Sequence, residues 1–244
     1  MAVNPTRTPN RLETIARRLC REVDGLSFPP PVAFVYNPLA YAFAPYRLYV
    51  RRYGAPPKQA LLVGMNPGPW GMAQTGIPFG EIHAVRSWMG IEAPVGKPAR
   101  LHPRRPVLGF ACRRSEPSGR RLWGLAARIG PPESFFRRFF VVNYCPLLFF
   151  DREGANLTPE RLPAQVSAPL FSACDRALAE TAAFLEPQAV VGIGRFAAER
   201  ARVALAGFGV VIGTLPHPSP ANPAANRDWE GQARAGLAEL GLAC

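Results

Sequence analysis

Three polar side chains stand just after short apolar runs that predict buried strands: Asn66 after ALLVGM, Asn143 after FFVV and His217 after GVVIGTLP. An asparagine side chain can orient a water molecule or read an amide-like edge, such as the Watson–Crick face of a base. A neutral imidazole can donate a hydrogen bond to an anionic oxygen that forms in a transition state. Taken singly, Asn143 is more often a turn residue and His217 a loop-capping residue, so the chemistry depends on their being brought together.

The loop that contains Asn66 spans residues 64–80 and carries no charge: GMNPGPWGMAQTGIPFG. Gly64 and Gly68 allow the backbone to approach a ligand closely, and the prolines fix the turn. Phe79 stands near the end of the loop, where its ring can stack on a planar group. The alternative is a tight turn that buries an aromatic residue, but the whole combination favours a pocket for a planar ligand.

Short apolar runs alternate with amphipathic segments, which predicts a parallel sheet with helices on both faces. The expected strands are 59–65, 139–150, 188–194 and 209–220, and the expected helices are 6–26, 81–90, 121–130, 170–186, 195–207 and 228–242. Residues 27–58 are interpreted as extended connections, and residues 94–121 as an irregular, strongly basic segment. Ligands of such sheets bind outside the carboxyl ends of the strands, so the candidate site lies in the loops 65–80, 143–150, 192–196 and 215–227.

Two of these loops have further features. Residues 217–226, HPSPANPAAN, contain three prolines and predict a stiff, preorganised loop around His217. Residues 192–197 match G-x-G-x-x-A, which mimics a dinucleotide-binding fingerprint. The acidic residue expected about twenty positions later is missing, so we interpret Gly194 as a glycine turn at a helix N-terminus that seats a single phosphate.

The charge balance of the chain points to a polyanionic partner. The sequence has 244 residues and a formal net charge of +12. Only Lys58 and Lys97 are lysines, so nearly all basic residues are arginines, which bind phosphate bidentately. An arginine-rich proteome from a GC-rich genome is the alternative explanation of the charge. The length suits one large α/β domain, residues 1–244, better than two small ones.

The cysteines do not suggest a metal site or a disulfide framework. All five are scattered and none forms a C-x-x-C pair: Cys20, Cys112, Cys145, Cys174 and Cys244. The sequence shows no signal peptide and no apolar run long enough to span a bilayer. We therefore expect a cytoplasmic, reduced protein. Separately, we expect a bacterial protein that is monomeric and uses no metal and no cofactor.

Two motifs, GMNPGPWGMAQTGIPFGE and HPSPANPAAN, together resemble the single-strand-selective monofunctional uracil-DNA glycosylases of the uracil-DNA glycosylase superfamily. The resemblance extends to HPRRPVLGFACRRSEPSGRRLWG and FFVVNYCPLLFFDREGANLTP, and covers the chain from about residue 30 to residue 230. It implies a three-layer αβα sandwich around a four-stranded parallel sheet. It also implies base-excision repair: a flipped deoxyuridine in single- or double-stranded DNA loses its base by hydrolysis of the N-glycosidic bond, leaving an abasic site.

The resemblance also implies a role for each site residue. Asn66 positions the attacking water, Phe79 stacks on the flipped base, Asn143 pairs with the uracil edge, and His217 stabilises the departing uracil anion at O2. Further substrate-binding positions are Gly64, Met65, Gly68 and Met72, of which Gly68 and Met72 line the place where the methyl group of thymine or a bound water would sit.

Contacts with the DNA are expected from the basic segment 97–121 and from the loop 217–226, which would act as a wedge in the duplex. The predicted DNA-binding residues are Arg104, Arg105, Arg113, Arg114, Gly194, Ser219, Pro220, Ala221 and Asn222. Some relatives carry an arginine where this chain has Ala221, which predicts a weaker wedge and slow action on well-paired U·A. The arginines of the basic segment, including Arg120 and Arg121, are expected to compensate or simply to bind phosphate.

Alternative functions on the same fold remain open at this point. The base could be hypoxanthine, xanthine or an oxidised pyrimidine such as hydroxymethyluracil, or the chain could be a non-catalytic module that binds damaged DNA. A pure binder would need neither Asn66 nor His217. Strand-cleaving lyase activity is not expected, because Lys58 and Lys97 both lie outside the four site loops.

Overall fold

The computed structural model describes residues 10–242, so the beginning of the expected helix at 6–26 and Cys244 lie outside the described residues. A parallel sheet with the strand order β3-β2-β6-β7 runs through the centre of the protein. Its strands are β2 (Ala60–Gly64), β3 (Phe139–Asn143), β6 (Ala189–Ile193) and β7 (Val211–Leu215). The prediction of a four-stranded parallel sheet is therefore confirmed.

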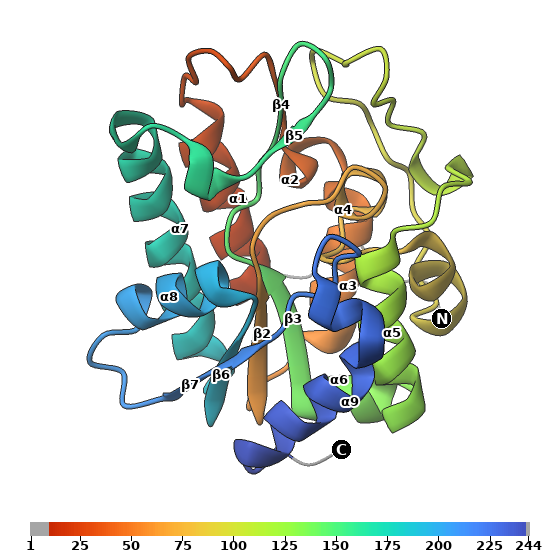
Figure 1. Ribbon diagram of the computed structural model, residues 1–244, viewed down its shortest axis with the longest axis vertical. Helices are drawn as coiled ribbons and strands as arrows, with labels where there is room; N and C mark the ends of the chain where they lie inside the picture. Colours follow the sequence, from red (N-terminus) through yellow and green to blue (C-terminus); the bar gives the residue numbers. More distant parts are fainter. Residues whose placement is uncertain (1–9, 243–244) are drawn as a thin grey trace.

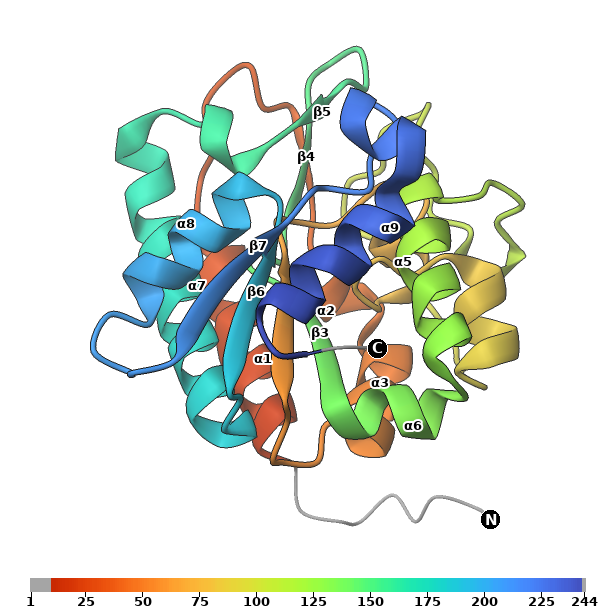
Figure 2. The same cartoon turned by 60° about the horizontal axis from the view of Figure 1, so that its bottom comes forward.

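Helices cover both faces of this sheet, as Figures 1 and 2 show. One face carries α1 (Arg11–Asp24), α7 (Ala164–Leu185) and α8 (Arg195–Ala204), and the other carries α5 (Pro117–Ile129), α6 (Pro132–Arg138) and α9 (Pro223–Glu239). The three-layer αβα arrangement is therefore confirmed. None of the described helices is long and apolar enough to cross a membrane.

The register of the parallel sheet aligns the carboxyl ends of its strands. Gly64 at the end of β2 lies opposite Asn143 at the end of β3, and Ile193 at the end of β6 lies opposite Leu215 at the end of β7. The loops that follow these strands consequently meet at one edge, which is the upper edge in Figure 1.

A second sheet, which the sequence did not predict, lies beyond this edge (Figure 1). It is antiparallel, with the order β1-β4-β5, and comprises β1 (Phe34–Tyr36), β4 (Leu148–Phe150) and β5 (Asn156–Leu157). The second expected strand is present as β3, whereas the loop expected after it, 143–150, ends in the unpredicted strand β4. Pro146 interrupts the apolar run, and the chain passes from the parallel sheet into the antiparallel one.

Residues 27–58 are not the extended connections that their composition suggests. They contain β1, α2 (Pro38–Tyr41) and α3 (Phe43–Tyr53). The Asn37 side chain caps α2 by accepting a hydrogen bond from the Leu39 N–H at 3.1 Å. The ring of Tyr49 in α3 stacks on Phe140 of β3 with 4.9 Å between centroids. The aromatic residues of this segment are therefore buried through short helices.

Several helix ends also differ from the prediction. α5 begins earlier than expected because Pro117 occupies the first turn, where its fixed φ suits a helix. α7 likewise begins earlier, at Ala164. α9 begins at Pro223 and has non-helical backbone at Asp228, where the helix was expected to start. The remaining short elements are α4 (Met72–Thr75), a π-helical turn (Ala84–Trp88) and two 3₁₀ turns (Gly109–Ala111 and Pro159–Arg161).

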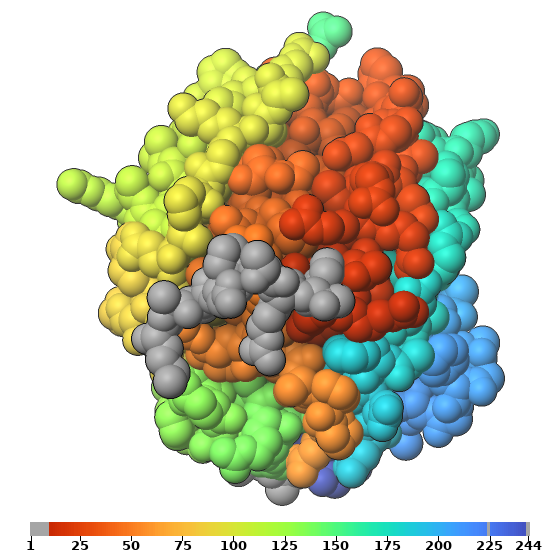
Figure 3. Space-filling model, turned by 180° about the vertical axis from the view of Figure 1, so that it is seen from behind, coloured from red at the N-terminus to blue at the C-terminus, as the bar shows by residue number. Residues whose placement is uncertain are grey.

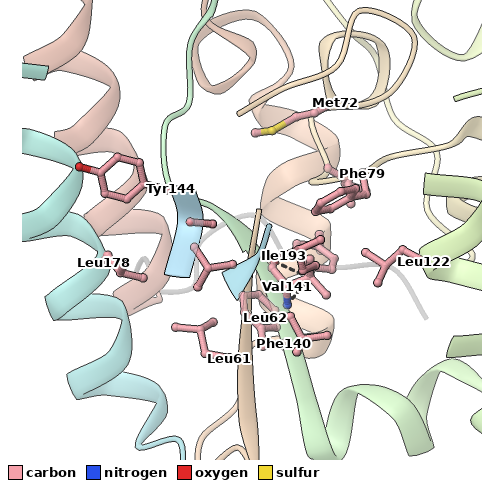
Figure 4. Packing of buried hydrophobic residues seen from close by; sticks show 14 of the residues in the cluster. Leu61, Leu62, Met72, Phe79, Leu122, Phe140, Val141, Tyr144, Leu178 and Ile193 are labelled. Carbon is pink, nitrogen blue, oxygen red and sulfur yellow. Dashed lines mark hydrogen bonds between the residues drawn. The ribbon is translucent and has the colours of Figure 1, made fainter. Parts of the chain in front are cut away.

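The hydrophobic core extends from the sheet to the floor of the loop region. Figure 4 shows Met72 and Phe79 above buried strand residues that include Leu61, Phe140 and Ile193. Seen from behind, segments from the first half of the chain form much of the surface (Figure 3). Met72 and Phe79 of the loop region are thus part of the hydrophobic core.

Candidate active site

A cavity of about 350 Å³ opens where the carboxyl-end loops meet. This volume lies at the lower end of the range for small-ligand pockets. With the exception of Gly64, the predicted catalytic and substrate-binding residues all line it: Met65, Asn66, Gly68, Met72, Phe79, Asn143 and His217. Ser219, predicted to contact DNA, also lines the cavity. Loops from three separate strands therefore meet at one site.

Asn66 is half-buried and anchored by one half of its amide. Its Nδ2 donates to the carbonyl oxygen of Leu147 at 3.1 Å, just before β4. Its Oδ1 makes no hydrogen bond within the part of the chain that the structure describes. Since a carbonyl oxygen accepts two hydrogen bonds, Asn66 can hold a water molecule through Oδ1 while Leu147 fixes the side chain.

Asn143 carries an unsatisfied acceptor on the cavity wall. Its Nδ2 contacts Sδ of Met72 at 3.2 Å, whereas its Oδ1 is buried and has no hydrogen-bond partner. A buried acceptor without a donor is costly, so a ligand N–H at this position would restore a lost hydrogen bond. A β-carbon at Gly64 would lie 2.5 Å from this Oδ1 and 2.5 Å from the Phe79 ring. Gly64 does not line the cavity itself, but its lack of a side chain allows Asn143 and Phe79 to approach each other.

Phe79 has a backbone conformation that bulky residues rarely adopt. Its φ is +51°, in the left-handed region. The indole N–H of Trp123 donates to the Phe79 carbonyl oxygen at 2.9 Å and holds the residue in place. The Phe79 ring lies 6.2 Å from the His217 ring, measured between centroids. Strain of this kind concentrates at binding sites, and here it places an aromatic face in the cavity.

The surroundings of His217 determine its tautomer. The Ser219 N–H donates to Nδ1 at 3.1 Å, so the neutral ring carries its proton on Nε2. Burial lowers the pKa of His217 below its usual range, which keeps the imidazole neutral. A β-carbon at Gly194 would lie 3.4 Å from the β-carbon of His217, so Gly194 forms the surface behind the ring. The site therefore presents an N–H donor without a positive charge.

The predicted phosphate seat at Gly194 is only partly available. The Gly194 N–H donates to the carbonyl oxygen of Leu215 at 2.8 Å, so phosphate could bind only the N–H groups that follow it in α8. Gly192 has a packing role, since a β-carbon there would overlap the backbone of Ala198 in α8.

The predicted DNA-binding arginines lie outside the cavity lining. Arg104 and Arg105 donate to the carbonyl oxygens of Glu153 and Gly154, at 3.3 Å and 2.8 Å. Arg113 and Arg114 are exposed, and Arg114 lies 4.3 Å above the centre of the Trp70 ring. These guanidinium groups belong to the surface beside the loop 64–80, which contains Trp70.

The loop 217–226 is braced mainly from α5. Arg121 donates to the carbonyl oxygen of Pro218 and to Oδ1 of Asn226, both at 2.9 Å, so it holds the loop and is less free to bind phosphate than predicted. Asn222 donates to the carbonyl oxygen of His217 at 3.1 Å. Pro220 and Ala221 are exposed at the tip, where a wedge would have to act.

Four further polar residues, which the sequence motifs do not indicate, line the cavity: Glu116, Ser118, Asn156 and Thr158. The Glu116 carboxylate caps α5 by accepting hydrogen bonds from the N–H groups of Ser118, at 3.2 Å, and Gly119. Burial raises the pKa of Glu116, while these two N–H groups act in the opposite direction. The only sequence signal was an acidic residue just before Pro117 at a helix start.

Both lysines lie outside the cavity lining, as predicted. Lys58 precedes β2, at the end of the strand opposite to the cavity, and its Nζ donates to the carbonyl oxygen of Phe136. Burial lowers the pKa of Lys58 to about 8. Among residues 10–242, no three His, Cys, Asp or Glu side chains are grouped as metal ligands would be. The expected absence of a metal or cofactor stays a prediction.

Comparison with known proteins gives a consistent result. Residues 51–237 match the Uracil DNA glycosylase superfamily. The chain is 52% identical over 228 residues to the single-strand selective monofunctional uracil DNA glycosylase of Mus musculus, covering 92% of this chain and 82% of that one. The corresponding protein of Bos taurus is 50% identical, with 92% and 84% covered. A crystal structure of SMUG2 from Pedobacter heparinus, only 16% identical, has the same fold, with a TM-score of 0.64 over 93% of this chain and 98% of that one.

Proposed function

The chain belongs to the single-strand selective monofunctional uracil-DNA glycosylases within the uracil-DNA glycosylase superfamily, and from this premise we propose how its residues act. It is a DNA glycosylase of base-excision repair that removes uracil and has no lyase activity. The observation that carries the residue assignment is that one cavity contains both a residue with a free hydrogen-bond acceptor and a residue with a free hydrogen-bond donor. Asn143, whose Oδ1 is a buried acceptor without a partner, lines the same cavity as His217, whose Nε2 is an uncharged N–H donor.

In the proposed mechanism the target nucleotide leaves the DNA stack and its base enters the cavity. The Phe79 ring stacks on the base, and Oδ1 of Asn143 accepts the N3–H of uracil while Nδ2 turns from Met72 to O4. Thymine would place a methyl group against Gly68 and Met72. The amide edge of uracil thus replaces the missing hydrogen bond of Asn143.

The C1′–N1 bond then breaks, and its electron pair leaves with the base. Nε2–H of His217 donates to O2 of the resulting uracil anion, as an oxyanion donor does. A water held by Oδ1 of Asn66 adds to C1′ of the sugar cation and loses a proton to solvent, and the uracil anion gains a proton from solvent. The products are uracil and an abasic site, and no lysine is needed.

Engagement of the DNA is proposed to combine the exposed arginines 104, 113 and 114 and the half-buried Arg105 with residues 219–222 and the N-terminus of α8. Phosphate contacts of this kind give affinity without reading sequence. We further propose that residues 1–244 form one domain, that the protein acts as a monomer without metal or cofactor, and that it works on nucleoid DNA in a bacterial cytoplasm.

The activity is tested with oligonucleotides that carry one uracil in a single strand, opposite guanine or opposite adenine. We expect release from all three, slowest for U·A, because a paired uracil costs more to extract and the wedge is weak. Abasic sites are revealed by hot alkali. Matched hypoxanthine, xanthine and hydroxymethyluracil substrates form the comparison arm. Release of one of these bases with no release of uracil would contradict the assignment.

Replacing Ala221 with arginine is expected to raise the ratio of the rate on U·A to the rate on the single-stranded substrate about tenfold above that of the wild type. The reason is that a longer side chain at the loop tip fills the gap left by the flipped base. Glutamine at the same position is the control: it adds length without the phosphate attraction of an arginine. The readout is the ratio of the two rates at fixed salt. An unchanged ratio in the arginine variant would show that the tip does not enter the duplex.

A further inference from the structure

Glu116 is a cavity residue for which the mechanism above has no role. Among the described residues that line the cavity, only Glu116 and His217 are ionisable. Asn66 is neutral and the imidazole of His217 is kept neutral, so neither can balance a positive charge. The reaction nevertheless generates positive charge on the deoxyribose as the C1′–N1 bond breaks.

The position of Glu116 relates it to the loop that carries Asn66. A β-carbon at Gly68 would lie 3.7 Å from Cγ of Glu116 and 3.8 Å from its Oε1, and one at Gly71 would lie 2.9 Å from Cγ. Because both positions are glycines, no side chain stands between the carboxylate and this part of the cavity wall. The acid therefore lies against the backbone just after Asn66.

The carboxylate is held in a fixed orientation. Ser118 and Gly119 each donate a backbone N–H to one of its oxygens, at the N-terminus of the 13-residue α5. Burial raises the pKa of Glu116, and the two hydrogen bonds, which favour the ionised form, oppose that rise. Each oxygen keeps a second lone pair. Capping alone does not explain the residue, since Asp, Asn, Ser and Thr are the preferred caps. Glutamate has one more carbon than aspartate, and this length places its carboxyl group against Gly68 and Gly71.

A carboxylate at this place should weaken binding of a polyanion, and the chain is otherwise strongly basic, at +12. A group that costs affinity for DNA is useful if its charge acts after binding, when the sugar becomes positive. Electrostatic groups aimed at charge that exists only in the transition state raise the rate without tightening substrate binding.

We propose that the Glu116 carboxylate stabilises the positive charge that develops on the deoxyribose during cleavage of the base. The inference rests on the proposed function and adds a residue to its site. No bond to Glu116 forms and no proton moves to it; the carboxylate acts through its charge, with Asn66 holding the water and His217 holding the base anion.

The test compares Glu116→Gln and Glu116→Ser with the wild type. Both remove the charge; glutamine keeps the length and serine is itself a good helix cap, so one variant should retain the fold. In single-turnover assays we expect the rate of uracil release to fall about 100-fold, the lower end of the loss seen when one preorganised electrostatic group is removed. Binding of uncleaved DNA should be unchanged or tighter. A purely structural cap predicts weaker binding and a lower melting temperature instead.

A second measurement isolates the charge. Oligonucleotides with a cationic pyrrolidine abasic analogue and with a neutral tetrahydrofuran analogue are compared as ligands. We expect the wild type to prefer the cationic analogue about tenfold or more, and both variants to lose that preference. The inference is overturned if the wild type and the variants prefer the cationic analogue equally, or if the wild type shows no preference for it. If the wild type still releases uracil, the proposed function stands in either case. Absence of uracil release by the wild type would instead reject the function.

Discussion

Replacing Asn66 with alanine is expected to slow uracil release by about 100- to 1000-fold while DNA binding changes little. The reason is positional: Oδ1 of Asn66 holds the attacking water, and the bond from Nδ2 to the Leu147 carbonyl at 3.1 Å holds Oδ1. Loss of a positioned reactant has effects of this size because orientation must then be achieved by chance. The measurement is a single-turnover rate with enzyme in excess.

Binding to an oligonucleotide with a tetrahydrofuran abasic site is the control for Asn66→Ala, since it does not require the water. Asn66→Asp is the matched variant, because aspartate keeps the shape but would face the Leu147 carbonyl with an oxygen. It should also lose activity if the anchor to Leu147 matters. An alanine variant within tenfold of the wild type would remove Asn66 from the mechanism.

Replacing His217 with leucine is expected to reduce the rate by about 100- to 1000-fold, as loss of an oxyanion donor does elsewhere. Leucine fills similar space but cannot donate to O2 of the uracil anion. The loss should be smaller with 5-fluorouracil as the leaving base, because fluorine stabilises the anion and less help is needed. Rates are compared for both bases in wild type and variant. An equal loss for both would mean that His217 acts on binding or folding and not on the anion.

The pH dependence of the wild type should follow the same imidazole. Burial lowers the pKa of His217, so the ring is neutral at pH 7. As pH falls through this lowered pKa, Nδ1 gains a proton and can no longer accept the Ser219 N–H, so the rate should fall with a midpoint below the usual value of about 6.5. Folding stability should also decline as pH falls, because the unfolded chain takes up the proton first. The leucine variant should lack both effects.

The sequence was sufficient to predict the parallel sheet and the residues at its carboxyl edge. The strands are short apolar runs, and parallel register necessarily brings the ends of neighbouring strands to one level, as Gly64 and Asn143 show. The positions of Asn66, Asn143 and His217 follow from this rule. The contacts that orient two of them, Leu147 with Asn66 and Ser219 with His217, could not be predicted, because they depend on loop conformation.

The features that were missed depend on long-range pairing with little local signal. β1 and β4 pair Phe34 with Phe150, and strands of three residues have too few positions to show a pattern. Glu116 looks like a surface residue in the basic segment until the fold places it against Gly68 and Gly71. Arg121 was expected at the DNA, but its guanidinium is occupied by the loop around Pro218.

The place of β7 in the sheet has a consequence for partly folded molecules. Asn66 and Asn143 follow the paired strands β2 and β3, whereas His217 follows β7. β3 and β7 form the two edges of the parallel sheet, but β3 is largely buried and β7 carries exposed residues. Edge elements are among the first to detach in local unfolding, and contacts between distant segments form late. A molecule with β7 detached would keep the base-reading amide and lack the anion donor. Such a molecule would recognise uracil in DNA without releasing the base. The order in which the chain assembles therefore separates recognition from catalysis.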